Sequence, residues 1–427
     1  MQRFICFLLM GLFTVNVCMA QFSAVGGSNG IPFVYQPSTN TGLDKVFVFN
    51  GLDNAKISYA VSNPSDWTWY RYAENPETAV VVASETTSSE TVLSNVEANC
   101  GYMVVSGESK HYIYVVGYTP FNYTEIRFKT DGDVCNSLNL IVLTDEQTLD
   151  YYTTKGLKTK LSRQHTLSWN TLEWSATDKA YKTIPQTSTT GNLAYWSVNA
   201  PLTDTYFTVS GDQFAQFFGT ATSFKSGLYQ AVAVKTNAQA EMQERKALNE
   251  LDRVSATGDL RGSAPLDIQF KSNPSDAVQL NEWLIYETPE VSEKFKKRID
   301  ADISYSFEQA GSFLVKLLVS NSTCKDSASF SPQVSISSLK CPNFFTPRST
   351  PGENDEFRVA FQSIVSFKGT IVNRWGNVLF EWSDPALGWN GTYKGKAVSP
   401  GVYFYLIEAK GSDGIVYKRK GDINLLE

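Results

Sequence analysis

Few side chains in this sequence have the type and spacing that catalysis requires. The 427 residues include two histidines, His111 and His165, and neither has a second histidine at metal-site spacing, so both are interpreted as surface residues. No His-Glu-x-x-His pattern, Gly-x-Ser-x-Gly pattern or Gly-rich phosphate loop occurs. Asp and Glu are scattered, so strand spacing alone cannot pair them as a glycosidase would. We therefore predict a non-enzyme, with no catalytic, cofactor-binding or metal-binding residues.

The cysteines offer a different chemistry, that of disulfides. Four of the six, Cys100, Cys135, Cys324 and Cys341, lie beyond residue 20. An even number in an exported chain favours disulfides, and four cysteines allow three pairings. We favour the two pairings between sequence neighbours, Cys100–Cys135 and Cys324–Cys341, and buried free thiols are the alternative. No Cys-x-x-Cys spacing indicates zinc.

The first residues predict export. Met1–Arg3 is a short positive start, Phe4–Val17 is mostly apolar, and Ala20 is a small residue just before Gln21. This pattern is typical of a signal peptide over 1–20, and the apolar run is too short for a membrane anchor. No later segment approaches the length needed to span a bilayer, so we predict a mature chain without a transmembrane segment.

Composition favours a secreted β-protein. Aromatic residues make up 13% and charged residues only 19% of the chain, and Thr, Ser, Val and Tyr are frequent. Strands favour these residues more than helices do. The formal charge of −6 leaves no basic field of the kind that binds nucleic acid. We predict an all-β fold of three or four tandem sandwich domains.

Gly, Pro and Asn punctuate the middle of the chain. Within 21–120, alternating runs such as Lys45–Phe49 and Trp67–Tyr72 indicate an immunoglobulin-like sandwich. Weaker strand signals over 121–235 predict a second β-domain, to which we assign no family. The range 236–257 has helical composition and is interpreted as a linker, with the edge of a long strand as the alternative.

The range 258–339 forms a further module. It opens with Gly262-Ser263-Ala264-Pro265-Leu266, carries Trp283 in its middle, and closes with Val319-Ser320-Asn321 and Cys324-Lys325-Asp326-Ser327. This order resembles a PKD domain, an immunoglobulin-like fold of surface proteins. The resemblance departs after Trp283, where the Phe-Gly-Asp-Gly of that family is missing. Asp326-Ser327-Ala328 also resembles the acceptor of the Bacteroidetes general O-glycosylation system, which predicts modification at Ser327.

The range 340–427 carries the most informative motifs. Its apolar alternating runs are separated by three turn signals, Asn373-Arg374-Trp375-Gly376-Asn377, Pro400-Gly401 and Ser412-Asp413-Gly414. Short strands with turns at this spacing predict a small antiparallel sandwich. The motif residues are Pro342, Asn343, Phe345, Thr346, Pro347, Asn354, Asp355, Phe357, Asn373, Arg374, Trp375, Gly376, Trp389, Gly391, Gly395, Pro400, Gly401, Tyr403 and Gly421.

In order and spacing this module resembles the gliding-motility-associated C-terminal domain of Bacteroidetes proteins, the type B sorting domain of type IX secretion. The resemblance implies a C-terminal β-sandwich and a route of export, with the translocon or an outer-membrane protein as partner. It implies no activity. The usual Asn-Gly-Asp-Gly loop is replaced by Arg348–Glu353, so we expect a local turn there rather than a Ca²⁺ site.

Three functions remain open at this point. We favour a modular protein of the cell surface or extracellular space, which binds a surface protein or glycan or serves as structure. Without a type IX system in the host, it would stay in the periplasm or at the outer membrane. The alternatives are an accessory part of the secretion or gliding machinery, and an exported glycan-binding protein or hydrolase with its site in 121–235. Aromatic runs at Trp67–Tyr72 or at Trp169 and Trp174 could form a sugar platform, although such residues are more often core.

Overall fold

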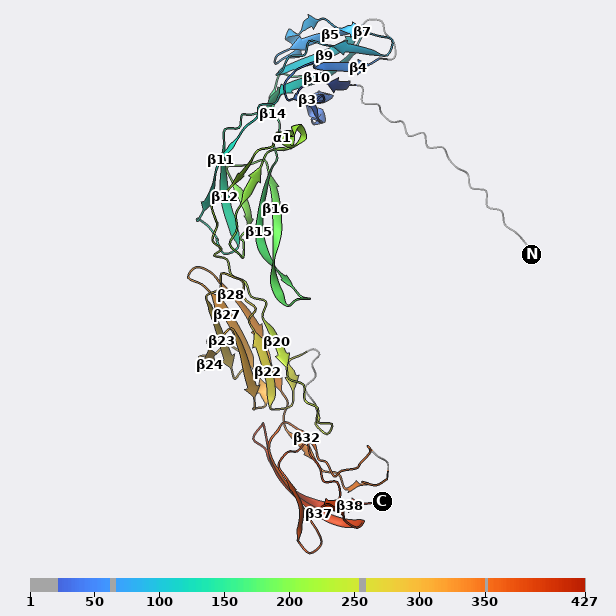
Figure 1. The fold of residues 1–427 in the computed structure, drawn as a ribbon, viewed down its shortest axis with the longest axis vertical. Coiled ribbons are helices and arrows are strands. Elements are labelled where there is room, and N and C mark those ends of the chain that lie inside the picture. The colour runs from blue at the N-terminus through green and yellow to red at the C-terminus, as the bar shows by residue number, and fades with distance from the viewer. Residues whose placement is uncertain (1–21, 62–66, 253–258, 350–351, 427) are drawn as a thin grey trace, which may run out of the picture.

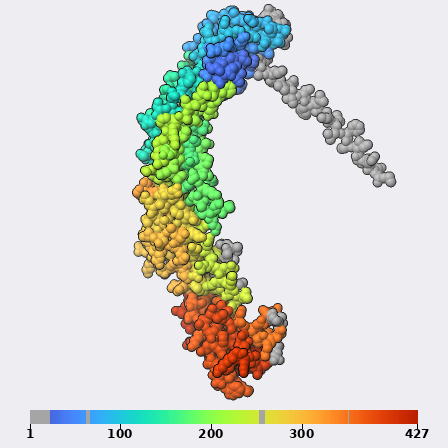
Figure 2. All heavy atoms as spheres, in the orientation of Figure 1, coloured from blue at the N-terminus to red at the C-terminus, as the bar shows by residue number. Residues whose placement is uncertain are grey.

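The computed structural model describes residues 22–61, 67–252, 259–349 and 352–426. The signal peptide predicted over 1–20 lies outside these residues. Nearly all regular structure is β-strand, and four β-sandwich domains follow one another along a curved rod (Figures 1 and 2). The predicted all-β fold of tandem immunoglobulin-like sandwiches with a C-terminal β-sandwich is confirmed.

The first domain packs a four-stranded sheet, β1-β4-β8-β7, on a six-stranded sheet, β2-β3-β10-β9-β5-β6. Trp69 lies buried between the sheets, and its indole N–H donates to Thr91 Oγ1 over 3.1 Å. The Tyr102 hydroxyl accepts a 2.7 Å hydrogen bond from the backbone of Glu97, as in the tyrosine corner of immunoglobulin-like domains. The elements are β1 (Phe22–Val25), β2 (Phe33–Tyr35), η1 (Thr39–Thr41), β3 (Lys45–Phe49), β4 (Lys56–Ala60), β5 (Thr68–Tyr72), η2 (Pro76–Thr78), β6 (Val80–Val82), β7 (Glu85–Thr86), β8 (Glu90–Leu93), β9 (Cys100–Ser106) and β10 (Ser109–Gly117).

The second domain joins the sheets β11-β12-β17 and β16-β15-β18-β19 around a core that includes Leu140, Leu167 and Phe207. Its longest hairpin, β15–β16, extends toward the third domain (Figure 1). The elements are β11 (Tyr123–Lys129), β12 (Ser137–Thr144), β13 (Asp150–Tyr152), β14 (Lys158–Lys160), β15 (His165–Ser175), β16 (Ala180–Thr190), β17 (Trp196–Asn199), β18 (Thr208–Ser210), α1 (Gln213–Phe218) and β19 (Ser223–Lys225).

The first two domains share a core at their joint. Val46 and Val48 of β3 point away from the first sandwich and pack in one cluster with Tyr151 of β13 and with Phe214 and Phe218 of α1. Strand β3 is therefore covered on both faces, which explains why its sequence is a continuous apolar run. The β13–β14 hairpin and α1 follow residue 120 in the sequence, yet they pack in one core with residues of the first domain. The domain boundary at residue 120 therefore remains a prediction.

The third domain contains the sheets β20-β22-β25, β24-β23-β27-β28 and β21-β29-β26. Trp283 is buried on β23 and donates to the carbonyl of Asp300 over 3.2 Å. The elements are β20 (Gln239–Met242), β21 (Arg261–Gly262), β22 (Leu266–Lys271), β23 (Leu280–Tyr286), β24 (Phe295–Arg298), β25 (Asp302–Phe307), β26 (Gly311–Ser312), β27 (Leu314–Ser320), β28 (Lys325–Phe330) and β29 (Gln333–Val334).

The helix considered for 236–257 does not form over 236–252, the part of that range that the structure describes. Gln239–Met242 forms strand β20, which pairs antiparallel with β22 and adds an edge to the third domain. Ala238, Ala240 and Met242 pack against the core of that domain. Ladder hydrogen bonds and this burial outweigh helix propensity, which is only a weak preference. The strand-edge alternative therefore describes Gln239–Met242, and the linker over the rest of the range remains a prediction.

The C-terminal domain is built on the five-stranded sheet β31-β38-β37-β33-β34, with the pairs β30-β32 and β35-β36 beside it. The turn at Asn373–Asn377 joins β33 to β34, and Gly376 there has φ 84°, as the hairpin signal predicts. The elements are β30 (Ser338–Lys340), β31 (Phe344–Phe345), β32 (Ala360–Gln362), β33 (Ile364–Val372), β34 (Val378–Trp382), β35 (Thr392–Tyr393), β36 (Lys396–Ala397), β37 (Gly401–Gly411) and β38 (Val416–Leu425).

Candidate functional site

One group of the C-terminal motif residues forms the core of that domain. Phe345, Phe357 and Trp389 are fully buried, and the Phe345 and Trp389 rings lie 5.4 Å apart. The Trp389 indole donates to the carbonyl of Thr392 over 2.8 Å, and Tyr403 packs edge-on against the Trp389 ring at 5.1 Å. Phe345, Phe357 and Trp389 stabilise the fold and offer a partner no surface, whereas Tyr403 is only partly buried.

A second group of motif residues shapes the backbone. Gly391 has φ 75°, and a side chain there would meet Leu425 at 3.0 Å, so glycine is required on both counts. Thr346 N–H donates to the carbonyl of Asn354, and the Asp355 carboxylate accepts from Gly352 over 2.6 Å. The remaining members are turn, strand-end or strand positions, namely Pro342, Asn343, Pro347, Gly395, Pro400, Gly401 and Gly421.

The third group is exposed. Trp375 stands at the tip of the β33–β34 hairpin with 71% of its surface accessible, and the Arg374 guanidinium lies 4.2 Å from its ring centroid. The Asn373 side chain holds this tip, because its Oδ1 accepts from the backbone of Trp375 and of Asn377, each over 3.0 Å. Of the motif residues, this pair is therefore the best placed to touch a partner.

An apolar strip continues from the hairpin along the solvent-facing side of β37. Val402, Phe404 and Leu406 alternate outward there and are all exposed. Beside Leu406 lies a hollow of about 510 Å³, lined in part by Lys368 and Lys420. We call Arg374, Trp375, Val402, Phe404 and Leu406 the sorting face.

Comparison with known families identifies this domain. Residues 339–425 match the family model of the CHU_C type IX secretion signal domain. The C-terminal domain is a CHU_C domain. Its presence indicates export to the cell surface or extracellular space and interaction with the secretion machinery. Among the described residues, no helix has the length and apolar character of a membrane span.

A second family model, the fibronectin type III domain, matches residues 127–226, for which the sequence suggested no family. Neither match covers the module at 258–339, so its PKD likeness remains a prediction. No curated protein matches the chain.

Several solved structures match this chain at low identity and low TM-score. The FN1–FN3 domains of chicken CNTN1 are 11% identical over 72% of this chain and 100% of theirs, with TM-score 0.24. A Ca²⁺-stabilized adhesin with which an Antarctic bacterium binds ice is 10% identical over 94% of this chain and 99% of its own, with TM-score 0.19. Immunoglobulin domains 1–5 of Sidekick-1 are 9% identical over 84% of this chain and 73% of theirs, with TM-score 0.23.

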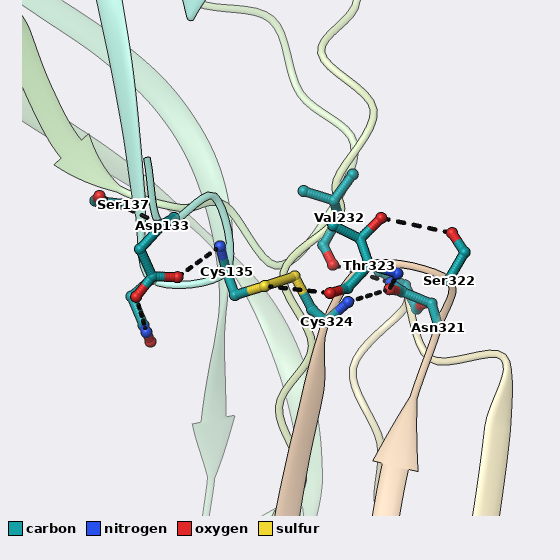
Figure 3. Close-up of a disulfide and its surroundings, with 10 residues drawn as sticks. Asp133, Cys135, Ser137, Val232, Asn321, Ser322, Thr323 and Cys324 are labelled. Carbon is teal, nitrogen blue, oxygen red and sulfur yellow. Dashed lines mark hydrogen bonds between the residues drawn. A yellow bond between two sulfur atoms is a disulfide. The ribbon is translucent and has the colours of Figure 1, made fainter. Parts of the chain in front are cut away.

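The disulfide joins two domains and contradicts both favoured pairings. Cys135, in the loop before β12, is bonded to Cys324, in the loop between β27 and β28, 189 residues away (Figure 3). Asp133 accepts from the Cys135 backbone over 3.2 Å, and Asn321 accepts from the Cys324 backbone over 2.8 Å. These carboxylate and amide groups fix the two loops that face each other across the joint.

The remaining two cysteines are free thiols, so the prediction that they are paired is wrong. Cys100 lies in the first domain and Cys341 in the CHU_C domain, at separate positions of the rod. Burial raises the pKa of both thiols, which lowers their thiolate fraction and hence their reactivity. The alternative of buried free thiols is correct in that both residues are unpaired, but both are only partly buried.

The sequence suggested that His165 is a surface residue. In the structure it is fully buried at the start of β15. Its Nδ1 lies 2.8 Å from the Tyr123 hydroxyl, and its Nε2 lies 3.1 Å from a Glu146 carboxylate oxygen. His111 lies on β10, where its ring is 5.0 Å from that of Tyr59.

A buried ion pair adjoins His165 at the first joint. Arg163 Nε donates to Asp212 Oδ2 over 2.6 Å, and both side chains are buried. Asp212 also caps α1, because its Oδ1 accepts from the backbone of Ala215 over 2.7 Å. The arrangement holds α1 in the core that it shares with the first domain.

Of the aromatic residues considered for a sugar platform, Trp67, Tyr70 and Trp174 are partly exposed and the other three are buried. Trp69, Tyr72 and Trp169 are core residues, and Trp174 packs against Tyr181 with ring centroids 5.3 Å apart. Trp69 and Tyr72 are three residues apart and so face opposite sides of β5, where Trp69 enters the sandwich core and Tyr72 enters the core of the first joint.

Ser327 is exposed on β28, the outermost strand of its sheet, so its hydroxyl is accessible to a modifying enzyme. The neighbouring Asp326 carboxylate accepts from the backbone of Thr236 over 3.0 Å and so helps to hold the second joint. Modification of Ser327 stays a prediction.

Proposed function

We propose that this chain is a non-catalytic surface protein, exported by the type IX pathway, that acts as a stiff stalk for binding or surface structure. The observation that carries the proposal is the rod of four sandwiches, each tied to the next by specific bonds, with a CHU_C domain at one end. A rigid spacer places its far end at a fixed distance from whatever retains the C-terminal end.

The second joint supports stiffness. Besides the disulfide, Thr203 donates to the Asp276 carboxylate over 2.7 Å, and Lys179 at the tip of the β15–β16 hairpin pairs with Glu241 of β20 over 2.9 Å. Together these bonds restrain bending of the second domain against the third.

The third joint is held by backbone and hydroxyl groups. The backbone of Ser363 donates to Ser263 Oγ over 2.5 Å, and the backbone of Ala264 donates to Ser363 Oγ over 3.0 Å. Nearby, Leu251 donates to the carbonyl of Phe361 over 2.7 Å, so the segment that leaves β20 is itself laid on the CHU_C domain.

The sorting face supplies the residues through which the chain would contact the secretion machinery. Exposed Trp and Arg side chains dominate the binding energy of many interfaces, and Arg374 and Trp375 are preorganised by their mutual contact. We assign to this face the contact with the secretion machinery.

The test is protease accessibility on whole cells, with a tag after Gln21. Truncation before Cys341 would also strip the partner from Leu251, so the sharper comparison is Trp375→Ala against Leu387→Ala, an exposed residue of the same domain outside the motif. We expect wild type and Leu387→Ala at the surface and Trp375→Ala retained inside.

Each other result is informative. Wild-type chain that stays protected from protease contradicts export, and normal display of Trp375→Ala contradicts the role of the sorting face. Stable association of the exported chain with the translocon would instead favour an accessory part of the machinery.

A further inference from the structure

The solvent-facing side of the sheet β16-β15-β18-β19 in the second domain has an unusual composition. The strand register places Thr189, Thr166, Ser210 and Ser223 side by side in one row across the four strands. The next row holds Thr187, Ser168, Thr208 and Lys225. Seven of these eight side chains are hydroxyls, and Lys225 is the one charge among them.

A hollow of about 360 Å³ opens at the end of the second row. It is lined by nine residues, namely Ser168, Trp169, Asn170, Pro185, Asp204, Thr205, Tyr206, Thr208 and Lys225. Tyr206 is 46% exposed, and the Lys225 ammonium lies 4.0 Å from its ring centroid.

The floor of the hollow is preorganised. The backbone of Asn170 donates to Thr205 Oγ1 over 2.9 Å, and the backbone of Ala231 donates to Asp204 Oδ1 over 2.8 Å. The second Asp204 oxygen and the Asn170 amide group make no hydrogen bond within the part of the chain that the structure describes. The Asp204 oxygen can therefore accept a hydrogen bond from a ligand, and the Asn170 amide group can both donate and accept one.

We propose that this hollow binds a neutral, hydroxyl-rich saccharide, and that the two hydroxyl rows extend the contact along its chain. Sugar hydroxyls both donate and accept hydrogen bonds, and so do Asn170, Ser168 and Thr208. The Tyr206 ring supplies the apolar surface that such pockets combine with a few placed polar groups. Asp204 and Lys225 carry opposite charges, so the lining offers no net charge to select an anion or a cation.

This inference rests on the proposed binding role of the exported chain and names the ligand class. The test is affinity electrophoresis of the purified full chain in native gels containing laminarin, xyloglucan or soluble starch, with polygalacturonate as an anionic contrast. Because export is scored on cells and binding on purified protein, the two proposals fail separately.

We expect retardation by at least one of the neutral polysaccharides, and at least about tenfold weaker retardation for Tyr206→Ala and Asn170→Ala, equivalent to about 1.4 kcal/mol. The matched control is Tyr195→Ala, which removes a tyrosine of the same domain that is 53% exposed and lies outside the hollow. Both Tyr206→Ala and the control should keep the wild-type melting temperature, since each removes an exposed side chain.

Three outcomes would overturn the proposal. They are absence of retardation by all three neutral polysaccharides, equal retardation of Tyr206→Ala and wild type, and retardation by polygalacturonate alone. The last result would assign the face to an anionic ligand, through Lys225.

Discussion

Removing the Asp212 carboxylate should loosen the first joint more than any surface change. In Asp212→Ala, the guanidinium of Arg163 keeps its buried position but loses the carboxylate 2.6 Å away. The backbone N–H of Ala215 loses its cap in the same step. Both losses act on α1, which carries Phe214 and Phe218 into the core shared with the first domain.

The magnitude follows from a buried guanidinium that keeps the more distant Glu146 carboxylate, 3.7 Å from Arg163 Nε, as its anionic partner. Breaking a buried ion pair by removing one partner costs about 3–5 kcal/mol, and loss of a helix N-cap adds about 0.5–2 kcal/mol. The double variant Arg163→Met, Asp212→Ser removes both charges and keeps an oxygen at the cap. It should recover most of the loss, because buried pairs are often replaceable by well-packed uncharged residues.

The assay is native-state hydrogen exchange read by mass spectrometry, because four domains need not unfold together and a single unfolding midpoint would mix them. Amides of α1 should exchange about 10²- to 10⁴-fold faster in Asp212→Ala, the factor that corresponds to about 3–5 kcal/mol. Amides of β27 in the third domain serve as the internal reference. An acceleration below about tenfold at α1, or an equal acceleration at β27, would refute the assignment of this ion pair to the joint.

Three further predictions concern the joints and the surface. Cys135→Ser removes the covalent tie between the second and third domains, so we expect the free energy of unfolding to fall by about 2–4 kcal/mol. We also expect a shorter maximum dimension in small-angle scattering, because the joint can then bend. Unchanged scattering would show that the hydrogen bonds alone keep the joint stiff. Burial, and then Asp212, raise the pKa of Tyr118 to about 12, against about 10 in the unfolded chain. This contribution to stability is therefore fully present below about pH 10 and falls as pH rises to about 12, so alkaline melts should show a slope that Tyr118→Phe reduces. Part of the slope should remain, because burial also raises the pKa of Tyr72, Tyr102, Tyr114 and Tyr123. Mass spectrometry of the chain exported by its host should find a glycan on the peptide with Ser327 and none after Ser327→Ala, and an unmodified native peptide would contradict this.

Local patterns account for what the sequence predicted correctly. The turn at Asn373–Asn377 needs only its own residues to reverse the chain. The alternation of apolar and polar residues along β12 and β15 indicates that one face of each strand is buried, whichever element packs against it. Motif order alone identified the CHU_C domain, because its glycines and buried aromatics serve the fold at fixed places.

The incorrect predictions all concern contacts between segments that are far apart in the sequence. Cys135 and Cys324 become neighbours only when two domains stack, so sequence proximity favoured the wrong pairings. His165 is buried because Arg163 and Asp212 meet beside it, a contact across 49 residues that no local window contains. The hollow beside Tyr206 likewise depends on the register of β15 with β18, and the hydroxyl rows are ordinary strand residues until that register is known.

The three joints use different chemistry, and they should therefore yield to different conditions. The first combines an apolar core with a buried ion pair, so alkali or loss of one charge opens it. The second contains a disulfide, so a reductant weakens it while leaving the others intact. The third combines backbone and serine hydrogen bonds, as between Ser263 and Ser363, with the Asp413 carboxylate that accepts from Ser337, and it contains no disulfide among the described residues. Because this last joint bears the CHU_C domain, the sorting face should keep its attachment to the rod in both the reducing and the oxidising compartments that an exported chain crosses.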